Sequence, residues 1–246
     1  LSPPLISYFL SLTLSYLPKK NLHNSPKHPN FVARNRFFLV KMLDLLIEKD
    51  KDLLCYFNGM GSYSADKLWL FITHELSSIP LYIFLLYLCF KHFNWKKTLL
   101  IIVFIAIIIA TTDQLANLFK HSFERLRPCH DPSLIGRMRM VICGGQYGFF
   151  SAHAANTMAL AVFFSWLLRK EVKYITLWLL CWSIIVGFSR IYLGVHFPGD
   201  VLVGWTIGAI LSSLYYLLFL LVEKNTPVNP PMKYTPPTTT DENTNP

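Results

Sequence analysis

Apolar residues dominate five long stretches of the chain, and polar or basic residues separate them. The stretches run approximately from Leu68 to Phe90, Leu99 to Phe119, Ala152 to Leu168, Val172 to Phe188 and Val201 to Val222. A helix needs about 20 residues to cross a bilayer core of roughly 30 Å, so each stretch is about long enough to span it. The pattern predicts an all-α integral membrane helical bundle with five transmembrane helices.

The connections between the stretches predict which loops meet. The basic connections Lys91–Lys97 and Arg169–Lys173 are short, and short turns join antiparallel neighbours in a bundle. Both therefore lie on one side, and the loops Lys120–Phe150 and Ser189–Asp200 lie together on the other. The positive-inside rule favours a multi-pass protein of the inner (plasma) membrane whose polar loops face the periplasm or exterior. Comparable positive charge stands on that other side, at Arg125, Arg127, Arg137 and Arg139.

The two ends differ from the apolar middle. Between Met42 and Phe57, apolar residues alternate irregularly with Asp and Lys, which predicts an interfacial amphipathic helix. Because Met42 is the first methionine, we expect residues 1–41 to be a non-native or disordered extension and residues 42–225 to form the membrane domain. The Pro-, Thr- and Asn-rich residues 226–246 are typical of a disordered tail.

Composition supports lipid as the solvent. Only 15% of the 246 residues are charged and 53% are hydrophobic, whereas soluble domains carry about 25% charged residues. The net charge of +9 comes from Lys and Arg scattered between apolar runs, a pattern that argues against nucleic-acid binding. The five cysteines have no paired spacing that indicates zinc, although Cys129 and Cys143 share one loop and could pair in an oxidising compartment.

The first candidate motif is KHSFERLRP. Lys120 and Arg127 are seven residues apart, so they fall on one helix face about 10 Å from each other, and Pro128 ends that helix. Taken singly, each basic residue could simply snorkel to lipid headgroups.

The second motif, YGFFSAHAAN, opens the third spanning helix. Free backbone NH groups at a helix N-terminus bind anions, and Ser151 adds a hydroxyl beside His153. Alone, Ser151 would be an ordinary N-cap and His153 an interfacial histidine.

The third motif, SRIYLGVHFPGD, places Arg190, His196 and Asp200 at a membrane boundary. Pro198 favours a helix start, so Asp200 lies in the first turn and close enough to accept the imidazole NH of His196. A carboxylate in that position fixes the tautomer and leaves the other nitrogen free for nucleophilic attack. The alternative is an Asp favoured by the helix dipole, with His196 as a bystander.

Together these residues suit phosphoryl transfer. Three cations neutralise the phosphate oxygens, and two histidines divide the nucleophile and acid roles. Asp131 and Asp200 are the only Asp residues in the two loops, whereas metal-dependent phosphatases bring several carboxylates to their ions. We therefore predict no metal, no cofactor and activity in chelator.

The three motifs, in order and spacing, resemble the type 2 phosphatidic acid phosphatase (PAP2) family pattern KxxxxxxRP, PSGH and SRxxxxxHxxxD. The departures are Phe150 for Pro and Ala152 for Gly, and the Ser and His of the second motif are intact. The resemblance implies that His196 is the nucleophile of a phosphohistidine intermediate, Asp200 its orienting partner and His153 the acid. It also implies that the phosphate is held by Lys120, Arg127, Ser151, the Ala152 backbone and Arg190. Asp113, seven residues before Lys120, is expected to orient Lys120 or line the pocket.

Substrate identity is less well defined by the motifs. A lipid phosphate in the membrane is the expected partner, and the short chain is similar to undecaprenyl diphosphate phosphatases. Phosphatidylglycerophosphate, phosphatidate and lipid A phosphates are the alternatives. A non-catalytic lipid-phosphate transporter or scaffold could use the same pocket, but it would have no need of an oriented imidazole. Oxidase chemistry, as in the related vanadate haloperoxidases, is a third hypothesis.

Overall fold

A computed structural model describes residues 29–225 and is helical throughout its regular segments. No strand forms in this part of the chain, only an isolated bridge between Leu126 and Tyr147. The main helices are α2 (Pro29–Gly59), α3 (Tyr63–Thr73), α4 (Ile79–His92), α5 (Trp95–Phe123), α6 (Ala152–Leu168), α7 (Ile175–Tyr192) and α8 (Pro198–Asn225). Short 3-10 turns are η1 (Glu75–Ser78), η2 (Pro128–His130) and η3 (Pro132–Leu134). The predicted all-α membrane fold is confirmed.

The apolar stretches correspond to helices of unequal form. By length and composition, α5, α7 and α8 are able to cross a membrane. Helices α3 and α4 reach this length only as a pair, which bends by 66° around η1. Helix α6 is apolar but has 17 residues, which is about 26 Å of helix. The expected number of five spans therefore stays a prediction.

Helix α6 lies inside the bundle, between α5, α7 and α8. Glycines of α8 allow its backbone to approach α6 closely. A Cβ atom at Gly204 would lie 2.6 Å from the Ser151 carbonyl oxygen, and one at Gly208 would lie 2.2 Å from that of Ala155. Small residues four apart permit such close packing in membrane helices. This packing places the start of α8 beside the start of α6, where the second and third motifs lie.

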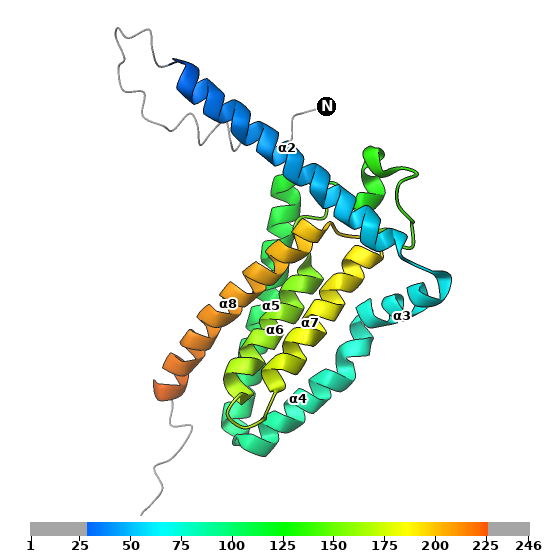
Figure 1. Ribbon diagram of the computed structural model, residues 1–246. Helices are drawn as coiled ribbons and strands as arrows, with labels where there is room; N and C mark the ends of the chain where they lie inside the picture. Colours follow the sequence, from blue (N-terminus) through cyan, green and yellow to red (C-terminus); the bar gives the residue numbers. More distant parts are fainter. Residues whose placement is uncertain (1–28, 226–246) are drawn as a thin grey trace, which may run out of the picture.

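Figure 1 shows the two ends of the bundle clearly. The α4–α5 and α6–α7 connections lie at one end. At the other end lie the long loop after α5 and the short loop between α7 and α8, and α2 crosses this end obliquely. The arrangement agrees with the loop grouping expected from the short turns.

The N-terminal segment differs from the expected boundary at Met42. Helix α2 begins at Pro29, so residues 29–41 are helical rather than disordered. Proline suits the first position of a helix, and the following Ala, Arg and Leu residues favour helix continuation. Large apolar side chains on α2 are exposed, including Phe37 at 71% and Leu45 at 58%, as expected of an interfacial helix. Residues 1–28 and the expected tail, 226–246, lie outside the described residues.

Candidate active site

The loops at the α2 end of the bundle bring the three motifs together. Lys120 lies in the last turn of α5, and Arg190 lies in the last turn of α7. Ser151 N donates to the backbone oxygen of Asp200 at 3.0 Å, which joins the second motif directly to the third. Arg127 Nη1 lies 3.4 Å from His196 Nε2, which joins the first motif to the third.

His196 and Asp200 form the buried centre of the site. Asp200 is fully buried, and His196 is only 2% exposed. Asp200 Oδ2 accepts from Phe197 N at 3.1 Å and faces His196 Nδ1 at 3.5 Å. That second distance is an ion-pair contact rather than a hydrogen bond, and Nδ1 has no other partner among the described residues. Because Asp200 is on the Nδ1 side, Nε2 is the nitrogen available to an electrophile.

The environment keeps His196 neutral at ordinary pH. Burial lowers the pKa of His196 to about 4, and the charges of Arg127 and Arg190 act in the same direction. The Asp200 carboxylate opposes them by stabilising the imidazolium. A neutral imidazole has the lone pair that nucleophilic attack requires.

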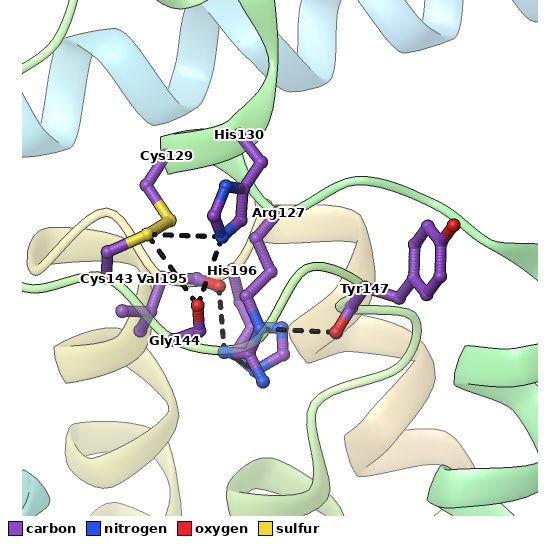
Figure 2. The surroundings of a disulfide bond; sticks show 8 residues. All are labelled: Arg127, Cys129, His130, Cys143, Gly144, Tyr147, Val195 and His196. Atoms are coloured by element: carbon purple, nitrogen blue, oxygen red, sulfur yellow. Dashed lines mark hydrogen bonds between the residues drawn. A yellow bond between two sulfur atoms is a disulfide. The ribbon is translucent and has the colours of Figure 1, made fainter.

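Arg127 is held by backbone oxygens on both sides of the site. Its Nε donates to the Tyr147 oxygen at 3.2 Å, and its Nη1 donates to the Val195 oxygen at 3.4 Å. Burial lowers the pKa of Arg127, and the charge of Asp200 opposes this effect. These contacts aim the guanidinium at His196, as Figure 2 shows.

Arg190 and Lys120 complete the positive wall. Arg190 Nη1 donates to Thr73 Oγ1 at 2.5 Å, whereas its buried Nε has no hydrogen-bond partner among the described residues. A phosphate oxygen is a suitable acceptor for such a buried donor. Lys120 lies near enough to Arg127 and Arg190 to feel both charges.

The second motif forms the start of α6 as expected. Ser151 is the N-cap residue, and its hydroxyl accepts from Ala154 N at 3.4 Å. Its hydroxyl proton remains available to a phosphate oxygen. The backbone NH groups of Ala152 and His153 belong to the first turn, where helices lack internal acceptors. His153 is partly buried and lies within electrostatic reach of His196, Arg190 and Lys120.

Asp113 contacts α6 rather than Lys120. Its Oδ1 accepts from Asn156 Nδ2 at 2.8 Å, and Asn156 in turn accepts from the hydroxyl of Thr112. Asn156 is one turn after His153 on α6. Asp113 therefore connects to the site through Asn156 and, by its charge alone, through Lys120.

A disulfide bridges the loop that carries Arg127. Cys129 and Cys143 are bonded, and the His130 Nε2 atom lies 3.5 Å from Cys143 Sγ (Figure 2). Inside the bridge, Arg127 N donates to the Gln146 oxygen at 3.0 Å. These cysteines with His130 are the one metal-type cluster found within residues 29–225. Metals bind cysteine as thiolate, so the bonded pair does not fit a metal site.

Two residues near the site have no place in the three motifs. Arg125 bonds to Asp200 and to Asp50 of α2, each at 2.6 Å. In the sequence, Arg125 reads as one more basic residue at a helix end, and Asp50 as one charge on an amphipathic helix. No local signal connects positions 75 residues apart.

The helical bundle and this buried pocket, with its three cations and two imidazoles, are those of a membrane phosphatase. The sequence model of the PAP2 superfamily matches residues 97–223, and the chain belongs to this family. The enzyme class predicted from the motifs is therefore confirmed.

Curated relatives extend the similarity beyond the motifs. The chain is 34% identical over 181 residues to the lipid A 4'-phosphatase of Bacteroides thetaiotaomicron, covering 72% of this chain and 80% of the relative. It is 30% identical over 181 residues to the lipid A 4'-phosphatase of Porphyromonas gingivalis, covering 72% and 76%. The fold matches the crystal structure of a transmembrane PAP2-type phosphatidylglycerolphosphate phosphatase from Bacillus subtilis. That match has a TM-score of 0.57 and 21% identity, and it covers 79% of this chain and 96% of the other.

Proposed function

We propose that the protein is a metal-independent phosphatase of lipid A that removes the 4'-phosphate through a phosphohistidine intermediate. The observation that carries the choice of substrate is the extent of the similarity to two lipid A 4'-phosphatases, which covers 72% of the chain in each case. The apolar bundle supports a lipid substrate, since its site opens beside the membrane-spanning helices.

The mechanism follows from the contacts of the two histidines. His196 Nε2 attacks phosphorus and forms the P–N bond, while the bond to the leaving oxygen breaks and His153 gives that oxygen a proton. Asp200 stabilises the imidazolium through Nδ1. Water, losing a proton to His153, then attacks the phosphohistidine and releases phosphate. Arg127, Arg190 and Lys120 neutralise the charge on the phosphoryl oxygens throughout.

The test is phosphate release by the detergent-solubilised protein in chelator. Four lipids are compared: bis-phosphorylated lipid A, undecaprenyl diphosphate, phosphatidylglycerophosphate and phosphatidate, with His196→Ala as the blank. We expect the highest kcat/KM on lipid A, with mass spectrometry showing loss of the 4'-phosphate. A higher kcat/KM on undecaprenyl diphosphate would select the substrate favoured by the sequence alone. Retention of lipid phosphate without turnover would instead indicate a transporter or scaffold.

The role of His153 has its own test. His153→Ala should slow release of a poor leaving group such as a sugar alcohol by on the order of 10²-fold or more. It should slow release of a nitrophenolate much less, because that leaving group departs without protonation. Equal losses on both substrates would remove His153 from the acid role.

A further inference from the structure

Arg125 connects three separate elements beneath the candidate nucleophile. Its Nη1 donates to Asp200 Oδ1 at 2.6 Å, and its Nη2 donates to Asp50 Oδ2 at 2.6 Å. Its guanidinium carbon also lies 4.3 Å from the centre of the Phe197 ring. The side chain therefore contacts α2, the loop after α7 and the first turn of α8 at once.

Asp50 is bound from two sides. One carboxylate oxygen accepts from Arg125, and the other accepts from Gly199 N at 2.7 Å. The space at Gly199 is tight, since a Cβ there would lie 2.9 Å from Asp50 Oδ2. Helix α2 is thus attached to the residue immediately before Asp200.

These contacts determine how the Asp200 carboxylate is held. A buried carboxylate is costly unless it is paired and hydrogen-bonded, and Arg125 is the cation that pairs with it. The planar fork of a guanidinium fixes direction as well as charge, and Asp50 fixes the second prong of that fork. With one oxygen held by Arg125 and the other by Phe197 N, the carboxylate has one orientation toward His196.

We propose that Asp50 and Arg125 are positioning residues for catalysis, forming a chain Asp50–Arg125–Asp200–His196 that makes α2 part of the catalytic unit. Arg125 is not a phosphate ligand in this proposal, because both terminal nitrogens are engaged with carboxylates. The inference rests on the proposed function, since it assigns roles that act through His196.

The experiment uses the full-length protein and four single variants. Arg125→Gln removes the charge and the fork, Arg125→Lys keeps the charge, and Asp50→Asn weakens the second prong. Lys51→Met is the matched control. Lys51 is next to Asp50 on α2 and binds the same loop, through Asp131 at 3.0 Å and Ser133 at 2.7 Å, but does not contact Asp200.

We expect Arg125→Gln to lower kcat by on the order of 10- to 100-fold, the usual loss when a partner that orients a reactive group is removed. KM should change little, because the phosphate ligands are intact. Arg125→Lys should recover part of the loss, Asp50→Asn should lose less than Arg125→Gln, and Lys51→Met should behave as wild type. A wild-type kcat in both Arg125→Gln and Asp50→Asn would overturn the inference.

Two further readouts separate positioning from general stability. In an Asp200→Asn background, Arg125→Gln should cause no further loss of kcat, because its route to His196 is already broken; losses that multiply would overturn the inference. The acid limb of the pH profile should also move to higher pH in Arg125→Gln, since Asp200 is then free to stabilise the imidazolium. The other groups facing His196 are Arg127, Arg190 and His153, and all three are unchanged in that variant.

Failure of the inference is distinct from failure of the proposed function. If wild-type protein releases no phosphate from any of the four lipids, the proposed function fails first. If wild type turns over and the Arg125 and Asp50 variants match it, only the positioning role fails. Should Arg125→Gln not fold, as judged by gel filtration, Asp50→Asn and Arg125→Lys carry the same comparison against Lys51→Met.

Discussion

The contact between Asp200 and His196 leads to the first prediction at the scale of single residues. Asp200→Asn should lower kcat by about 10² to 10⁴, because an amide neither holds the imidazole tautomer nor stabilises the imidazolium. Its KM should stay near wild type, since Asp200 does not face the phosphate oxygens. Steady-state kinetics on lipid A measure both values. A loss in KM alone would place Asp200 in substrate binding.

The acidity of His196 gives a second prediction. Attack requires the neutral imidazole, so activity should be lost as pH falls through the pKa of His196, which burial lowers to about 4. The acid limb of kcat/KM should therefore lie well below the ordinary histidine value of about 6.5. The substrate phosphate also titrates near 6, so its own ionisation must be measured and removed from the profile. A corrected limb near 6.5 would mean that His196 is hydrated in solution.

Single residues also show how far sequence alone reaches. Lys120, Arg127, Ser151, His153, Arg190, His196 and Asp200 were all expected at one site from motif spacing, and the structure brings them to one end of the bundle. Asp113 was expected near Lys120 because helical spacing places it on that face, but its hydrogen bond goes to Asn156 across the helix interface. Spacing within a helix says nothing of what a neighbouring helix offers.

At the scale of elements, the approach of α8 to α6 controls the geometry of the site. A Cβ atom at Gly208 would lie 2.2 Å from a backbone oxygen of Ala155, which cannot move aside as a side chain can. Gly208→Ala should therefore separate the helices and lower the free energy of unfolding by about 1–3 kcal/mol. Thermal unfolding in detergent measures the change.

The matched control for Gly208→Ala is Gly59→Ala at the end of α2. An added methyl group there meets nothing within 4 Å. The control should unfold at the wild-type temperature. Equal unfolding temperatures for the two variants would contradict the close-packing argument.

Elements also show why the helices were easier to place than their bends. The stretch from Leu68 to Phe90 is continuously apolar, so it reads as one span, yet the structure breaks it at η1. Pro80 lies in the first turn of α4, where its missing NH is tolerated, and this fixes a new helix start within the stretch. Hydrophobicity sets which residues avoid water, whereas the break depends on local backbone chemistry that the hydropathy pattern does not contain.

At the scale of the whole molecule, all site residues lie at the end of the bundle that α2 crosses (Figure 1). Contacts such as Arg125 with Asp50 join segments 75 residues apart, and only the assembled bundle reveals them. The exposed apolar side chains of α2 suit a helix that lies on the membrane surface above the site. The helix then has two functions, membrane contact and support of the Arg125 network.

The side of the membrane on which the site opens gives the last prediction. The positive-inside rule places the turns Lys91–Lys97 and Arg169–Lys173 in the cytoplasm, and the bond between Cys129 and Cys143 requires an oxidising compartment at the opposite end. In intact cells, a membrane-impermeant maleimide should label Cys143 in a Cys129→Ser variant but not in wild type unless a reductant is added first. A fluorescent protein fused after α8, which ends at the cytoplasmic side in this orientation, should fluoresce. Absence of Cys143 labelling in intact cells, with labelling only after lysis, would reverse the orientation and place lipid phosphate hydrolysis on the cytoplasmic face.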